Sequence, residues 1–126
     1  MRRLLPVLLA LLPLPAVADN AVTLSIRTSV PAMLTAYELT GGDWVSAPVP
    51  GAVFRPGEPV TLVNRPDTPG EAPGGFLTLT PAGGGAVTVT WSRAGAAVRA
   101  TAATRATGIP ASAAVSGSTV SVVIGD

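Results

Sequence analysis

Short runs of apolar and β-branched residues, separated by glycine and proline, are the feature that most restricts the fold of this chain. In residues 21–28, Val22, Leu24 and Ile26 alternate with polar residues, which predicts a strand with one buried and one solvated face. Similar runs recur at fairly even spacing, and no stretch carries the apolar stripe of a long helix. The sequence therefore predicts an all-β fold, a small antiparallel β-sandwich.

The predicted strands all end at glycine, proline or another turn residue. They cover residues 21–28, 33–39, 58–64, 75–80, 86–92 and Thr119–Ile124. Residues 81–85 suit a hairpin connection, and the glycines of 41–43 suit a tight reversal.

Four other segments are expected to be irregular or are ambiguous. Residues 46–57 carry three prolines and predict an extended connection without a regular ladder, and residues 65–74 predict a loop. In residues 94–106 the alanines favour helix while valine and threonine favour strand, and no cap defines a helix; strand and loop are the preferred interpretation. Residues 108–117 are expected to form turns.

The first eighteen residues have the pattern of an export signal. Arg2 and Arg3 precede an apolar stretch, residues 4–14, and 16–18 form a small-x-small cleavage site. The stretch is shorter than the roughly 20 apolar residues of a membrane span. We expect residues 1–18 to be removed, leaving 19–126 as a single β-sandwich domain in the periplasm or outside the cell.

Composition restricts the chemistry of the chain. It contains no histidine, cysteine or lysine, and its arginines are scattered. The usual catalytic base, the thiolate nucleophile and the commonest transition-metal ligands are therefore missing, as is the basic face of a nucleic-acid-binding protein. We predict a protein that is not an enzyme and has no cofactor, no metal, no disulfide and no lipid-bearing cysteine. The remaining catalytic hypothesis is glycoside hydrolysis by two carboxylates among Asp43, Glu58, Asp67 and Glu71, which all lie in or beside predicted turns.

The few aromatic residues are candidates for ligand contact or for the core. Trp44, between a Gly-Gly-Asp turn and the proline-rich stretch, is the best candidate for an exposed contact, although an indole folded over one end of the sandwich fits equally well. Tyr37 lies on a mixed face. Trp91 shares strand parity with Val87 and Val89, which favours the core; Phe54 and Phe76 are also expected in the core.

Two arginines border predicted loops. A guanidinium at Arg65 or Arg93 suits bidentate binding of a lipid phosphate or a sugar acid, while a purely solubilising role is the simpler interpretation.

The order of several short motifs resembles the aegerolysin family. The motifs are Gly42-Asp43-Trp44, Pro48, Pro50, Val53, Pro56-Gly57, Gly74-Gly75, Gly83-Gly84 and the run from Val87 to Trp91. The resemblance covers about residues 22–91, and residue by residue only Trp44 and Trp91 match motif positions. It implies a small exported β-sandwich that recognises particular membrane lipids, sometimes recruiting a larger pore-forming partner.

Two binding hypotheses follow from these observations. The first is an exported protein that recognises membrane lipid headgroups, with Trp44, Tyr37, Arg65, Trp91 and Arg93 as candidate contacts. The second is a structural or interaction domain that binds another exported protein by pairing an exposed strand, Thr119–Ile124, with the partner's sheet edge.

Overall fold

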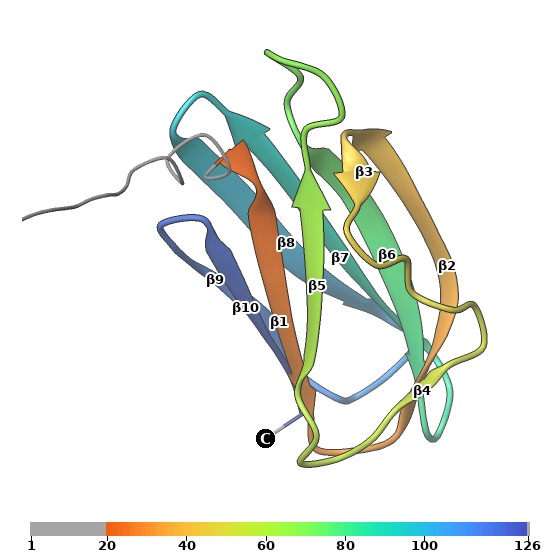
Figure 1. Ribbon diagram of the computed structural model, residues 1–126. Helices are drawn as coiled ribbons and strands as arrows, with labels where there is room; N and C mark the ends of the chain where they lie inside the picture. Colours follow the sequence, from red (N-terminus) through yellow and green to blue (C-terminus); the bar gives the residue numbers. More distant parts are fainter. Residues whose placement is uncertain (1–19, 126) are drawn as a thin grey trace, which may run out of the picture.

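The computed structural model describes residues 20–125, which form ten strands and no α-helix (Figure 1). The strands are β1 (Val22–Thr28), β2 (Ala32–Gly41), β3 (Asp43–Trp44), β4 (Val53–Phe54), β5 (Val60–Arg65), β6 (Gly74–Pro81), β7 (Ala86–Ala94), β8 (Ala97–Arg105), β9 (Ala111–Ser116) and β10 (Thr119–Ile124). The predicted leader, residues 1–18, lies outside the described residues. Within these residues there is no helix long and apolar enough to cross a membrane.

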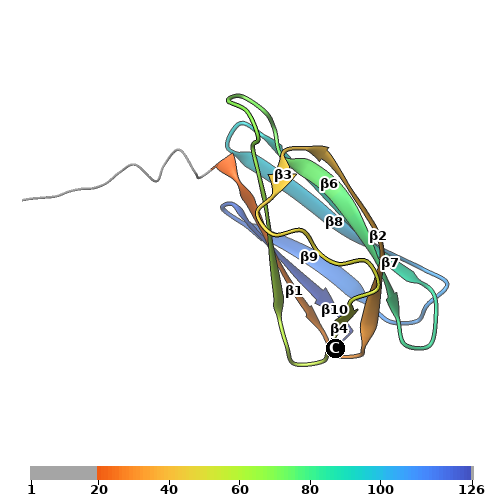
Figure 2. The same ribbon diagram turned by 45° about the vertical axis from the view of Figure 1, so that its right-hand side comes forward.

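The strands form two five-stranded sheets that pack face to face (Figures 1 and 2). The first sheet has the order β3-β5-β1-β10-β9, and the second has the order β4-β2-β6-β7-β8. All pairs are antiparallel except β1 with β10, which run parallel. The predicted all-β sandwich is confirmed, with one parallel pair inside a mostly antiparallel arrangement.

Side-chain alternation places the core between the sheets. Val22, Leu24 and Ile26 of β1 are buried, as the alternation predicts, and they pack in one cluster with Leu77 and Leu79 of β6. The other buried hydrophobic residues of this cluster are Ala32, Leu34, Phe54, Leu62, Val87, Val89, Trp91, Val120, Val122 and Ile124. The expectation that Phe54 and Trp91 belong to the core is confirmed.

The expectation of turns over residues 108–117 is wrong for most of that segment. Residues Ala111–Ser116 form β9, which pairs with β10 along its whole length. The segment contains mostly alanine and serine, which carry little intrinsic β preference, so neighbouring strands decide its conformation. β9 also changes the place of β10, which is not an exposed strand because it pairs with β1 on one side and β9 on the other.

The expectation that Phe76 lies in the core is also wrong. Phe76 alternates along β6 with the buried Leu77 and therefore lies on the outer face of the second sheet, where it is half-buried. Its cross-strand neighbours are Glu38 of β2 and Thr90 of β7. Cross-strand packing of an aromatic ring stabilises a sheet on either face, so the hydrophobicity of Phe76 alone does not show whether it faces the core or the solvent.

Two further segments, the ambiguous residues 94–106 and the proline-rich residues 46–57, are largely extended. Residues Ala97–Arg105 form β8 at the edge of the second sheet, in agreement with the preferred interpretation of strand and loop. Residues 46–57 form an extended connection, but its expected lack of pairing is wrong at Val53–Phe54, which forms the short strand β4 against β2. In both views this connection crosses the side of the sandwich between β5 and β2 (Figures 1 and 2).

Candidate functional site

One end of the sandwich gathers four connections and the start of β1, at the top of Figure 1. The connections are β2–β3 at Gly42, β5–β6 over residues 66–73, β7–β8 over residues 95–96 and β9–β10 over residues 117–118. We call this region the loop end. Two of the five candidate contact residues, Arg65 and Arg93, lie here.

The loop end contains an open hollow of about 580 Å³. Its apolar floor includes Ala21, Val45 and Val63, and the Val45 amide donates a hydrogen bond to the Val63 carbonyl oxygen over 2.9 Å. The rest of the lining is Asn20, Arg65, Pro66, Asp67, Thr68, Pro69 and Gly70. This size falls within the usual range for sites that hold a small organic group.

Arg65 supplies the positive charge of the hollow. Arg65 is exposed, and its backbone pairs in register with that of Asp43 in β3. Among residues 20–125 no hydrogen bond or ion pair engages the Arg65 guanidinium. All of its donors therefore remain available to an anion in the hollow.

A short turn orders the wall of the hollow. The backbone N–H of Asp67 donates a hydrogen bond to Glu71 Oε1 over 2.7 Å. This bond, with a further one from the backbone of Gly42, lowers the pKa of the Glu71 carboxyl from its ordinary value. Because the carboxylate is the favoured form, the turn is intact above the ordinary pKa and loosens as pH falls through the lowered one.

Arg93 has a different environment from Arg65. Its Nη1 donates hydrogen bonds to the Ala21 carbonyl oxygen over 3.0 Å and to Ser118 Oγ over 2.8 Å, and its Nε donates to the Gly95 carbonyl oxygen over 2.9 Å. One guanidinium thus ties together the start of β1, the β7–β8 turn and the β9–β10 turn. The structure therefore places Arg93 as a support of the loop end.

The three candidate aromatic residues form one cluster between the sheets. The ring centroids of Tyr37 and Trp44 lie 6.0 Å apart with an interplanar angle of 79°, and those of Trp44 and Trp91 lie 5.8 Å apart at 54°. Trp91 is buried, whereas Tyr37 and Trp44 are half-buried at the side of the sandwich. We call these three residues the aromatic cluster. The Trp44 indole combines packing against the core with access to solvent, so neither interpretation of Trp44 is complete alone.

Asn64 is the residue that sequence reasoning missed. It is fully buried in β5, and its Oδ1 accepts a hydrogen bond from Trp91 Nε1 over 3.0 Å. Its Nδ2 donates to the carbonyl oxygens of Gly41 and Asp43 over 3.1 and 3.2 Å. The sequence does contain a sign of this role: Asn64 has the same strand parity as Leu62 and so faces inward, and an inward-facing polar side chain needs buried hydrogen-bond partners.

The reversal before Trp44 requires glycine for two reasons. Gly42 has a φ of 77°, in the left-handed region. A Cβ built there would lie 2.4 Å from the Arg65 carbonyl oxygen and 2.7 Å from Asn64 Nδ2. The Gly42-Asp43-Trp44 motif therefore sets the position of Trp44 and the edge of the hollow together.

Metal-ligating side chains do not gather at this end or elsewhere in residues 20–125: no three of them come close enough to hold an ion.

Comparison with known proteins identifies the fold alone. No protein-family model matches the chain, and no curated protein matches it. The chain is similar in structure to IP-1A from Alcaligenes faecalis, known from a crystal structure at 1.8 Å resolution, with a TM-score of 0.67 and 10% sequence identity. The similarity covers 89% of this chain and 95% of that one.

Proposed function

We propose that this chain is an exported protein that binds lipid headgroups at a membrane surface and catalyses no reaction. The observation that carries the proposal is the hollow at the loop end, where the unengaged Arg65 guanidinium stands beside an apolar floor. A lipid headgroup region offers the matching chemistry, an anionic phosphate next to apolar glycerol and acyl carbons. The aegerolysin-like order of motifs supports the same class of ligand, and the export signal predicted for residues 1–18 supports a site of action in the periplasm or outside the cell.

The candidate contacts have unequal roles in this proposal. Arg65 binds the phosphate, and Arg93 holds the surrounding turns in place. Trp44 directly precedes Val45 of the hollow, and with Tyr37 it offers a half-exposed ring at the side of the sandwich, while Trp91 supports Trp44 from the core. The strand-pairing hypothesis is not proposed further, since Thr119–Ile124 already has a neighbour on each side.

Co-sedimentation with vesicles tests the proposal. The mature protein is mixed with vesicles of phosphatidylcholine alone or with added phosphatidylglycerol, phosphatidylethanolamine or sphingomyelin. We expect Arg65→Gln to weaken binding to the preferred composition by about tenfold or more, because a charge-assisted hydrogen bond to phosphate is lost.

Arg105→Gln is the matched control. Arg105 is exposed on β8, and its loss changes net charge by the same amount without touching the hollow. We expect less than a twofold effect. Equal losses in both variants would show that only net charge matters, and a wild-type protein that sediments with no vesicle would refute headgroup binding.

A further inference from the structure

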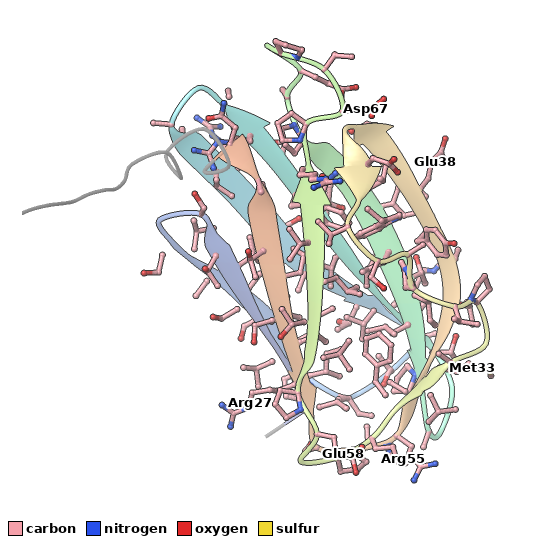
Figure 3. All side chains as sticks on the ribbon, viewed as in Figure 1. Arg27, Met33, Glu38, Arg55, Glu58 and Asp67 are labelled. Carbon is pink, nitrogen blue, oxygen red and sulfur yellow. The ribbon has the colours of Figure 1, made fainter. Side chains whose placement is uncertain are left out.

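The connection between β3 and β4 exposes an unusual amount of apolar surface. Along residues 45–53, which we call the apolar strap, Val45, Val49 and Val53 are 54%, 66% and 52% exposed. Met33 of β2, the register partner of Val53, is 42% exposed, and Figure 3 shows it on the outside of the sandwich beside β4. Of the six large hydrophobic residues that are exposed in residues 20–125, four lie on or against the strap.

The strap is also free of charge. No Asp, Glu, Lys or Arg occurs from Trp44 through Phe54. A connecting segment at the surface ordinarily gains solubility from charged residues, and a contiguous apolar surface marks a contact site. Core packing does not account for Val49 or Val53, since neither belongs to the core cluster.

The backbone of the strap is suited to a region with little water. Pro48 and Pro50 have no N–H to satisfy. The amide of Gly51 donates to the Leu34 carbonyl oxygen over 2.8 Å, and that of Ala52 donates to the Val49 carbonyl oxygen over 3.0 Å. Irregular backbone can enter the edge of a hydrocarbon layer only when few of its polar groups are left unpaired, and this strap meets much of that requirement.

The strap is continuous with the proposed headgroup site. Val45 belongs to both, because it is the first strap residue and part of the floor of the hollow. Trp44 directly precedes Val45 in the chain and packs against Tyr37, so two rings with polar tips lie beside the strap, as aromatic residues do at membrane interfaces. Arg55 follows the other end of the strap and points into solvent in Figure 3, where it can reach lipid phosphate.

We infer that the apolar strap, with Met33, enters the interfacial region of a phospholipid bilayer while the hollow holds a headgroup. The inference rests on the proposed function and adds the orientation of binding: the side of the sandwich between β5 and β2 faces the bilayer. Headgroup recognition then provides selectivity, and burial of the strap provides affinity that high salt does not remove.

Quenching of Trp44 tests this orientation. With vesicles of phosphatidylcholine brominated on the acyl chains, at the preferred headgroup composition, we expect quenching of tryptophan fluorescence in the wild-type protein. Val49→Ser with Val53→Ser should weaken partitioning by about tenfold, since burying each half-exposed valine contributes roughly three- to fourfold. Both side chains are exposed, so the variant should keep the wild-type unfolding curve.

Val115→Ser with Val123→Ser is the matched control. These valines are 41% and 39% exposed, on β9 and β10. We expect less than a twofold change in partitioning. If the strap and control variants partition equally, or if bound protein shows no quenching, the strap does not enter the bilayer.

Micelles of the uncharged detergent dodecyl maltoside separate this inference from the proposed function. They offer an apolar interior without phosphate, so wild type and Arg65→Gln should bind them equally and the strap variant should bind more weakly. Suppose that Arg65→Gln loses vesicle binding and the strap variant changes binding to neither micelles nor vesicles. That result would refute insertion of the strap and would still support the headgroup site. If the protein instead binds micelles through the strap but binds no vesicle, headgroup binding is refuted and the strap is an apolar contact surface for something other than a phospholipid bilayer.

Discussion

The two sides of this sandwich are closed in opposite ways. On one side the aromatic cluster spans from β2 to β3, and Trp91 reaches from β7 to a hydrogen bond with Asn64 of β5. On the other side, β8 and β9 approach each other with Cα atoms within 8 Å. Their half-buried residues that pack against the core include four alanines, Ala100, Ala102, Ala111 and Ala113, which we call the alanine seam.

The difference shows that a sheet pair can be sealed by large or by small side chains. Large rings fill a wide gap, and a buried polar group then has to satisfy the indole N–H. Alanines fill almost no space, so they let the edges of the sheets approach. The aromatic side closes the gap between the sheets and also leaves part of Trp44 exposed to solvent, whereas the alanine side only closes the gap. The following substitutions test this contrast.

The largest effect is expected for Trp91→Ala. It removes a side chain that is 1% exposed and leaves Asn64 Oδ1 without its donor. We expect a loss of about 3–5 kcal/mol in the free energy of unfolding, measured by urea denaturation of the protein. Trp91→Phe keeps most of the ring and should cost clearly less. Equal costs for both variants would mean that the hydrogen bond, and not the volume, closes this side.

A smaller effect is expected for Asn64→Ala. The Trp91 N–H and the carbonyl oxygens of Gly41 and Asp43 would each lose a partner. Since unsatisfied buried groups are costly, we expect a loss of about 2–3 kcal/mol in the same measurement. Thr61→Ala, at an exposed position of the same strand, should change stability by less than about 0.5 kcal/mol. A cost no greater than that of this control would show that water replaces the side chain.

The smallest of the three effects is expected for Ala113→Leu in the alanine seam. Added volume between β8 and β9 should push the edges apart and cost about 1–2 kcal/mol. Ala114→Leu is the control, because Ala114 is exposed and lies on the opposite face of β9. If Ala113→Leu is as well tolerated as Ala114→Leu, the seam is not closely packed and the contrast between the two sides fails.

Much of the fold could be predicted from the sequence because strand alternation is a local signal. Val22, Leu24 and Ile26, and later Val120, Val122 and Ile124, have the period of two that buries one face. The strand Ala111–Ser116 could not be predicted in this way, because alanine and serine give no contrast between its faces. Its conformation is set by β10, which is a tertiary effect. Phe76 is hydrophobic, which predicts the core, but its parity with Thr78 puts it on the outer face of β6.

The candidate site was less predictable because it depends on which connections meet. Arg65 and Arg93 both border connections in the sequence, yet only the structure shows Arg93 engaged by Ala21 and Ser118, which lie far from it in the chain. The two residues are of the same type and both border a connection, but only Arg93 is held by hydrogen bonds to other parts of the chain. The hollow likewise joins residues just before β1, just after β3 and in β5, and no local pattern contains that combination.

The parallel pairing of β1 with β10 means that the chain enters the sandwich at the loop end and leaves it at the opposite end (Figure 1). A circular permutant that joins the two ends therefore needs a linker spanning a strand of six or seven residues, roughly 20 Å, where a tight turn would be too short. The same arrangement makes the end after Ile124 a suitable point of attachment to a solid support. A protein tethered there would present its hollow to solution.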